Sequence, residues 1–231
     1  MQKAILSKRF NQWGSKHLTR IYGGIRMSMQ QVLEELIKDT IAPLLKAEGF
    51  KKRGKNFAKL LPDLAWTLNI QSSMWNTKDE VEFTLNTGIF TEKLFGTMYE
   101  FEAPQFPSEI SSVLRLRINE LKGTKDDWYN LDEKTDIQEL KNIITRDIQE
   151  TILPHFNKFQ SLTDLIAELE KWPENEMPGS PHELTILYYN TGKEELALER
   201  LKNFISNCKL DSKKKYAMEL LEWLELASNI K

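Results

Sequence analysis

Side chains that could hold an anion recur at every second position of three short segments. In each segment the polar residues alternate with apolar ones, and a tryptophan follows the last segment. The candidate site residues are Asn69, Gln71, Thr84, Asn86, Arg115, Arg117 and Trp128. Amides beside guanidinium groups, which present a fixed fork of N–H donors, suit a carboxylate or phosphate group of a peptide or small ligand. The pattern predicts a ligand-binding surface if the segments lie side by side.

The same residues have a purely structural interpretation. An antiparallel sheet commonly keeps one face in water, and on such a face Arg115 and Arg117 would pair with Glu82 or with neighbouring acids. The sequence leaves both interpretations open.

Other chemistry finds little support in the residue types. His17, His155 and His182 stand far apart, and no CxxC, HxH, HExxH or glycine-rich phosphate loop occurs. We expect His155 to be a packing histidine near a helix end and His182 to be exposed. Cys208 has no histidine close to it in sequence and is expected to be a structural or surface thiol. We therefore expect no metal, no cofactor and no catalytic residue, although an enzyme is not excluded.

The segments that must position the candidate site have the period of strands. In residues 65–71 and 81–90, large apolar residues recur at every second position, such as Trp66, Leu68 and Ile70 in the first segment. This period is typical of strands with one buried face. Residues 113–119 continue this alternation, residues 126–131 form a further short strand, and residues 50–61 a strand or tight hairpin.

Helices flank these strands. Ser28 and Gln31 form a capping box before a helix that reaches Gly49, and Pro43 should kink or divide this helix near Asp39. Later helices have predicted N-caps at Thr135, Ser161 and Ser180, and the first of them should stop before Pro154. The fold class is therefore α+β: an antiparallel sheet of four to five strands, with an N-terminal helix packed on one face and a C-terminal helical portion.

Breaker residues and charge divide the chain into three parts. Residues 1–27 are a basic leader without acids, for which we consider a translation start at Met27 or Met29. Residues 28–172 form the α+β domain, and a proline-rich linker follows. Residues 173–231 are expected to be a helical cap on the sheet domain. One helix pair in it resembles a tetratricopeptide repeat through Leu184, Tyr188, Gly192, Ala197 and Leu201, and a third helix uses Tyr216, Leu220, Trp223 and Leu224.

Composition limits the partners. The net charge of −2 gives no overall attraction to nucleic acid, so nucleic acid is an unlikely partner, although Lys51 to Lys59 is locally basic. No apolar run is long enough to span a membrane, and the single cysteine does not require an oxidising compartment. We therefore expect a cytoplasmic protein without a membrane partner. Another protein is the expected partner, and the oligomeric state is open.

The region from about residue 33 to 165 resembles a bacterial family known as domain of unknown function 4304. The matching elements are Pro43 to Leu45, Gly49 to Lys52, Phe57, Asn69 to Gln71, Phe83 to Ile89, Arg115 to Ile118, Trp128 and Pro154 to Phe156. The resemblance implies a compact α+β domain of bacterial cytoplasmic type, and it implies no activity.

The expected function is a noncatalytic protein-binding module. The missing catalytic motifs, the acidic charge of the chain after the leader and the repeat-like tail favour it. An immunity-type partner of a toxin is an example by analogy. The alternative is a small-ligand-binding or enzymatic domain that uses the polar sheet face around Arg115 and Arg117.

Overall fold

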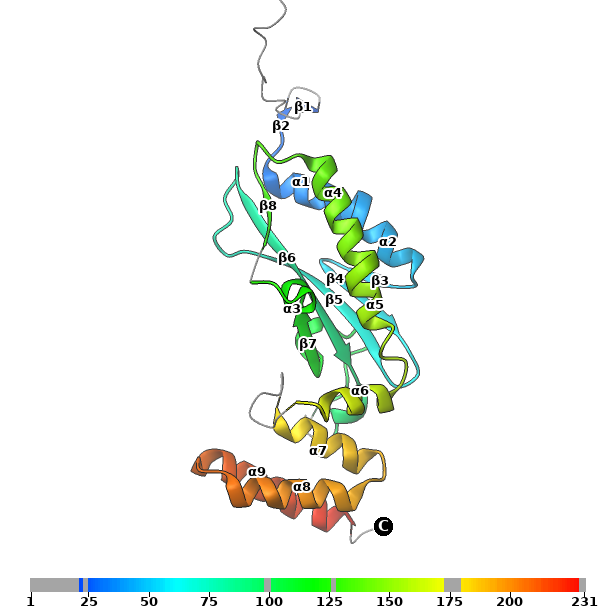
Figure 1. Ribbon diagram of the computed structural model, residues 1–231, viewed down its shortest axis with the longest axis vertical. Helices are drawn as coiled ribbons and strands as arrows, with labels where there is room; N and C mark the ends of the chain where they lie inside the picture. Colours follow the sequence, from blue (N-terminus) through cyan, green and yellow to red (C-terminus); the bar gives the residue numbers. More distant parts are fainter. Residues whose placement is uncertain (1–20, 23–24, 98–100, 126–127, 173–179, 229–231) are drawn as a thin grey trace, which may run out of the picture.

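The computed structural model of the chain describes residues 21–22, 25–97, 101–125, 128–172 and 180–228. It has the predicted α+β architecture, with one main antiparallel sheet, helices on its apolar face and further helices at the C-terminal end (Figure 1). Most of the leader lies outside the described residues. Its described part forms the short strands β1 (Ile21–Tyr22) and β2 (Ile25–Arg26), which pair with each other.

The main sheet has six strands, one more than the upper bound that the sequence suggested. In chain order the strands are β3 (Lys51–Arg53), β4 (Asn56–Leu60), β5 (Ala65–Ser72), β6 (Val81–Phe90), β7 (Leu114–Arg117) and β8 (Tyr129–Leu131). The first five are adjacent in this order, and β8 pairs with β6. Both β7 and β8 pair with β6, β7 along Asn86–Ile89 and β8 along Val81–Phe83. The long β6 therefore pairs with both of the later segments, 113–119 and 126–131, that the sequence predicted to be strands.

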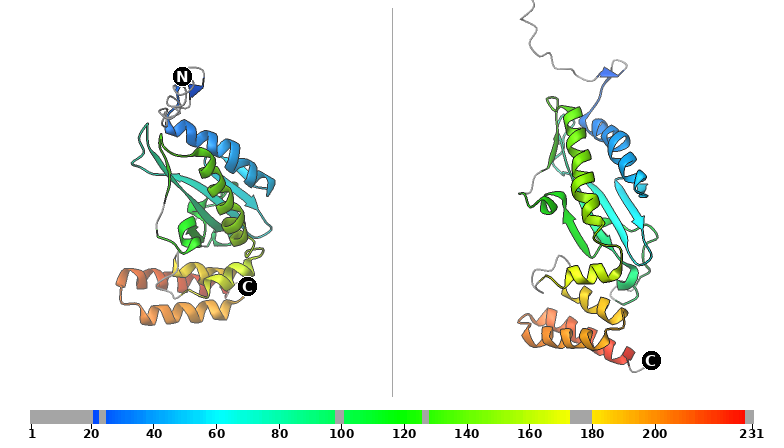
Figure 2. Two further views of the ribbon diagram at one scale, coloured as in Figure 1. Left: turned by 45° about the horizontal axis from the view of Figure 1, so that its top comes forward. Right: turned by 45° about the vertical axis from the view of Figure 1, so that its right-hand side comes forward.

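Two long helical runs pack on the apolar face of the sheet (Figures 1 and 2). The first comprises α1 (Met29–Leu36), the π segment η1 (Ile37–Ile41) and α2 (Ala42–Ala47), and the second α4 (Ile137–Arg146), the π segment η4 (Asp147–Ile152) and α5 (Leu153–Phe156). Their apolar side chains join those of the strands in one core, where the ring of Trp66 stacks on that of Phe156 at 5.4 Å.

A proline follows each π segment. Pro43 and Pro154 lack the N–H that would continue an α-helix, and their rings crowd the carbonyl four residues earlier. The wider turn before each proline keeps the helix continuous. The predicted disturbance near Asp39 therefore takes the form of a π segment. The helix that begins near residue 137 was predicted to stop before Pro154. This prediction is wrong, because α5 continues to Phe156.

The helix starts are mostly as predicted. Ser28 and Ser161 each form a capping box, and the Ser180 hydroxyl accepts a hydrogen bond from the His182 amide. The exception is Thr135, because the N-cap of α4 is the next residue, Asp136. The Thr135 hydroxyl instead donates to the Asp132 carboxylate in the preceding turn.

The C-terminal helices pack on one another and on the end of the sheet. They are α6 (Leu162–Leu169), α7 (Pro181–Asn190), α8 (Glu194–Asn207) and α9 (Asp211–Ser228). The Asn190 amide of α7 donates to the Lys93 carbonyl at 2.5 Å, next to the short helix η2 (Glu92–Leu94). The buried face of α9 is formed by Ala217, Leu220 and Leu224.

The third helix packs through the expected residues, although not all of them are fully buried. Tyr216 and Trp223 are about two-fifths exposed, and their rings pack on those of His182 and Tyr189. His182 is buried instead of exposed, because its ring packs edge to face on that of Phe204 at 4.8 Å. The linker around residues 173–179 lies outside the described residues, and the division into domains at this point stays a prediction.

None of the helices in the described part of the chain combines the length and the apolar character that crossing a bilayer requires.

Candidate functional site

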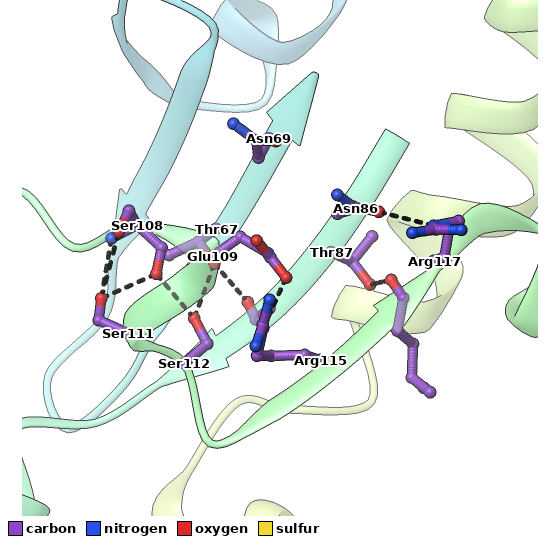
Figure 3. A network of polar contacts seen from close by, with 12 residues as sticks. Thr67, Asn69, Asn86, Thr87, Ser108, Glu109, Ser111, Ser112, Arg115 and Arg117 are labelled. Carbon is purple, nitrogen blue, oxygen red and sulfur yellow. Dashed lines mark hydrogen bonds and ion pairs between the residues drawn. The ribbon is translucent and has the colours of Figure 1, made fainter. Parts of the chain in front are cut away.

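The register of the sheet places the predicted polar residues on one face. Asn69 of β5 pairs with Asn86 of β6, and Asn86 pairs with Arg117 of β7. In the neighbouring rows Gln71 pairs with Thr84, and Gly88 with Arg115. Paired residues of adjacent strands project to the same side. Arg117 and Asn86 accordingly point toward each other, as the prediction of a shared face required (Figure 3).

A chain of hydrogen bonds crosses the face at the Asn86 row. The Asn86 Nδ2 donates to Gln71 Oε1 at 2.8 Å, and the Asn86 Oδ1 accepts from Arg117 Nε at 3.2 Å. The guanidinium carbon of Arg117 lies 5.2 Å from the centre of the Trp128 ring, which is within the range of a cation–π contact. The Arg117 head group is thus oriented by an amide and by an aromatic ring.

The second arginine is held by an acid that the sequence prediction did not include. Arg115 Nε donates to Glu109 Oε1 at 2.6 Å, which is a short, charge-assisted hydrogen bond (Figure 3). The Glu109 side chain is 10% exposed, whereas that of Arg115 is 44% exposed. Glu109 therefore fixes the Nε side of an arginine whose side chain is almost half exposed.

A close approach of the chain to the sheet brings Glu109 into place. Glu109 belongs to the one-turn helix η3 (Glu109–Ser111), and Ser112 follows it directly above Gly88. A Cβ atom on Gly88 would lie 2.5 Å from both Ser112 Oγ and Thr67 Oγ1, so only glycine fits here. The Thr67 and Ser112 hydroxyl oxygens lie 2.9 Å apart, and Thr67 also donates to the Gly88 carbonyl. Gly88 therefore permits the contact that positions Glu109.

A short helix also borders the site, at residues that the sequence predicted to continue the strand. Strand β7 ends at Arg117, and α3 (Ile118–Lys122) begins immediately. The Arg117 amide donates to the Glu120 carboxylate at 2.6 Å, and Gly123 ends the helix in the left-handed conformation. The helix turns Asn119 inward, where its Oδ1 is buried and has no hydrogen-bond partner.

Together these groups surround an open pocket of about 440 Å³. It is lined by Gln71, Asn86, Glu109, Arg115, Leu116, Arg117, Asn119 and Glu120. We call it the polar pocket. Two guanidinium groups and two carboxylates face it, so its charges are balanced within the chain. Chemically, it offers oriented N–H donors on one side and carboxylate acceptors on the other.

Some predicted site residues do not reach the polar pocket. Asn69 instead donates to Asn56 Oδ1 at 2.8 Å, across to β4. Thr84 is completely buried, and its hydroxyl has no hydrogen-bond partner. Trp128 lines a neighbouring pocket of about 320 Å³. The polar face is therefore only partly in water, and Arg115 pairs with a neighbouring acid, Glu109, as the structural interpretation expected.

The neighbouring pocket explains why Trp128 stays beside Arg117. The Asp147 carboxylate, which is buried, accepts from Tyr129 Oη at 2.6 Å and from Lys122 Nζ at 3.0 Å. Tyr129 lies in β8 and Lys122 in α3, so Asp147 ties both elements to the helix that contains it. This contact fixes the strand that follows Trp128.

Sequence reasoning missed Glu109, Asn119 and Glu120. Gly123 after Lys122 was a usable sign of a helix end, and an acid three residues after Arg117 fits the start of that helix. Nothing in the local pattern pointed to Glu109, because its role depends on a loop crossing the sheet.

The remaining titratable candidates have structural positions. Burial lowers the pKa of His155 to about 4, and its ring packs edge to face on Phe159 at 5.2 Å, as expected for a packing histidine. Burial also lowers the pKa of His182. Cys208 is a half-buried thiol at the C-terminal end of α8. Among the described residues, no group of three or more His, Cys, Asp or Glu side chains could hold a metal ion.

Comparison with known proteins gives a family without an assigned activity. No curated protein and no solved structure was found to match the chain. The family model described as Domain of unknown function (DUF4304) matches residues 41–158, just over half of the 231 residues. This range includes all six strands of the main sheet and every residue of the polar pocket. The chain therefore belongs to the DUF4304 family.

Proposed function

We propose that this chain is a noncatalytic protein-binding module whose polar pocket receives a carboxylate of the partner. The observation that carries the proposal is the position of Arg115. Its Nε donates to Glu109, while its half-exposed side chain borders the pocket beside Arg117. An arginine held through Nε keeps its two terminal nitrogens in a fixed plane, and this is the geometry that recognises a carboxylate through two parallel hydrogen bonds.

The charge balance of the pocket favours a carboxylate over a phosphate. Glu109 and Glu120 stand beside the two arginines and would repel a second negative charge on the ligand. A carboxylate carries one charge, and its two oxygens match one guanidinium edge. The open shape suits a side chain or chain end that projects from a larger molecule.

The contacts of the two acids favour binding over catalysis. Glu109 holds Arg115, and Glu120 accepts from the backbone amide at the start of α3. Both carboxylates therefore maintain the shape of the pocket in this arrangement. A toxin recognised by an immunity-type protein would be one partner of the proposed kind, an idea that is supported by analogy alone.

The test is affinity capture from an extract of the source organism with three forms of the chain. We expect a protein that is retained by the wild type and by Arg53→Ala, but is lost with the double variant Arg115→Ala, Arg117→Ala. Arg53 is the matched control because it is an exposed arginine on the edge strand β3. Capture of no reproducible protein, or equal capture by the double variant, would contradict the proposal. Circular dichroism must show that the double variant is folded, since unfolding would assign the arginines a structural role.

The second candidate is a small anionic ligand in the same pocket. Its volume of about 440 Å³ is within the range of small-molecule sites and favours this alternative. A ligand that binds the folded state raises its melting temperature with concentration. Acetate and lactate, which each carry one negative charge, would then stabilise the wild type but not the double arginine variant. If neither anion raises the melting temperature, this candidate loses its support.

A further inference from the structure

The loop between β5 and β6 presents two large apolar side chains to solvent. Met74 is 86% exposed and Trp75 80%, the highest values among the large hydrophobic side chains that the structure describes. The loop projects from the end of the two long strands, on the left in Figure 1. We call residues 73–80 the hairpin tip. Exposed single apolar residues are common, but two adjacent ones on a projection form a small binding surface.

The backbone of the hairpin tip is held by hydrogen bonds on both sides. The Ser73 amide donates to the Glu82 carbonyl at 2.9 Å, and Asn76 extends this pairing. Asn76 Nδ2 donates to the same carbonyl at 3.0 Å, while its Oδ1 accepts from the Glu82 amide at 2.8 Å. The Thr77 hydroxyl accepts from the amide of Glu80 at 3.1 Å. These contacts fix the turn that displays Met74 and Trp75.

Helix α1 anchors the far side of the tip. The Met29 amide donates to the Lys78 carbonyl at 2.9 Å, and the Gln30 side-chain amide donates to the Thr77 carbonyl. The loop is thus attached to an element whose apolar side is part of the core. A preorganised loop loses little conformational entropy when it binds, so the burial of its side chains contributes more fully to affinity.

The residue types match those that dominate protein interfaces. Tryptophan is enriched among the residues whose removal weakens binding most, because it buries a large area with only two side-chain torsions. Methionine adapts its flexible thioether chain to irregular surfaces. Trp75 is therefore the expected anchor and Met74 the adaptable neighbour.

The charges around the tip define the partner. Asp79, Glu80 and Glu82 stand beside Lys78, and all four are exposed. The pairing of Val81 with Leu131 places the turn after β8, which contains Asp132, Glu133 and Lys134, next to this group. The two apolar side chains are therefore bordered by an excess of acids. A basic surface on the partner would complement them.

We propose that the hairpin tip docks on a protein that has an apolar pocket bordered by lysine or arginine side chains, with Trp75 inserted into the pocket. An anionic membrane surface fits poorly because it would repel the acids of the tip. A second copy of the chain fits poorly too, because a two-fold contact would place the same acids opposite one another. The inference rests on the proposed function only in taking the ligand to be a protein, and it uses a surface separate from the polar pocket.

The experiment uses a photo-crosslinking residue in the full chain. Benzoylphenylalanine replaces Met74 in one form and Ile110 in another, and both forms are irradiated in an extract of the source organism. Ile110 is 76% exposed and follows Glu109, so it reports on the polar pocket. A form with the residue at Leu60, which is 59% exposed on β4, gives the background.

The expected result is one protein that crosslinks at position 74 above the Leu60 background. The purified partner should bind Trp75→Ala at least tenfold more weakly than the wild type, and Leu60→Ala with unchanged affinity. Glu80→Gln combined with Glu82→Gln should weaken binding about threefold and reduce its dependence on salt. The crosslinked residue of the partner should lie in an apolar pocket with a basic border.

Several results would overturn the inference: crosslinking at position 74 to a second copy of the chain, sedimentation of the chain with phosphatidylglycerol vesicles, no product above background, or unchanged affinity of Trp75→Ala. If the proposal for the polar pocket is wrong, the result is different: no crosslinked protein forms at position 110, or the double arginine variant binds the partner as well as the wild type does. The two proposals can therefore fail independently.

Discussion

The polar pocket and the hairpin tip belong to the same sheet but use their side chains in opposite ways. In the pocket, Arg115 is held by Glu109, and Asn86 bonds to neighbours on both sides. In the tip, the backbone is hydrogen-bonded while Met74 and Trp75 face solvent. Polar contacts within the chain stabilise the folded state and fix orientation. Exposed apolar area contributes free energy only when a partner covers it.

This difference can be tested by separating stability from binding. Substitutions in the polar pocket should lower the free energy of unfolding, whereas substitutions in the hairpin tip should leave it unchanged.

The largest effect in the polar pocket is expected for Gly88→Val. The new Cβ would lie 2.5 Å from Ser112 Oγ, so η3 must move away from the sheet. We expect the free energy of unfolding to fall by about 3 kcal/mol, measured by urea denaturation. Ser112→Gly in the same chain removes one of the two crowded side chains, leaving that of Thr67, and should restore part of the loss. An unchanged urea midpoint would show that the close approach does not hold the pocket together.

His155 lies outside the polar pocket and the hairpin tip, and its burial should make the free energy of unfolding depend on pH. Burial lowers the pKa of His155 in the folded state from 6.5 to about 4, so the unfolded chain takes up a proton first as the pH falls. The contribution of His155 is therefore fully present above pH 6.5 and is lost toward pH 4, by about 2 kcal/mol at pH 4.5. His155→Phe should remove this part of the pH dependence in urea denaturation at pH 7 and 4.5.

Glu183 is a second buried group that titrates in this range, so the wild type and His155→Phe must be compared with each other at each pH. Burial raises the pKa of Glu183 to about 7, so its contribution to stability declines as the pH rises from 4.5 to 7, opposite to that of His155. Glu183 is present in both proteins and cancels in the difference between them. If that difference does not change with pH, His155 titrates normally in the folded chain.

A smaller, asymmetric effect is expected for the ion pair of the polar pocket. Arg115→Ala leaves the Glu109 carboxylate buried without this arginine, at a cost of about 2 kcal/mol. Glu109→Gln leaves a half-exposed guanidinium group that water can solvate, at a cost of about 1 kcal/mol. Thermal and urea unfolding of the two variants measure this order. The reverse order would mean that Glu109 is better hydrated than its burial indicates.

The smallest effect on stability is expected at the tip. Trp75→Ala should change the free energy of unfolding by less than about 0.5 kcal/mol, because the side chain is already in water. Trp66→Ala is the matched control, since that ring is buried, stacks on Phe156 and donates to the Phe159 carbonyl. It should cost about 3 kcal/mol or more. Similar losses at both positions would remove the distinction between a stabilising region and a binding region.

Much of the fold could be predicted from local patterns. The alternation in residues 65–71 and 81–90 identified β5 and β6, and Ser28 and Ser161 identified two helix starts. The failed prediction for residues 118–119 overlooked a competing signal that is itself local. Ile118 and Asn119 continued the strand alternation, yet they form α3, whose first turn is closed by Glu120.

The sequence by itself determined which residues share a face of the sheet. Side chains alternate across a strand because of backbone geometry, so Asn86 and Arg117 could be placed together once their segments were paired. Only the tertiary structure decided which of them meet water and which meet one another. Thr67 reaches Ser112 across 45 residues, and η3 then covers part of the polar face. Such contacts depend on how a loop packs in space, and no local repeat of residue types encodes that packing.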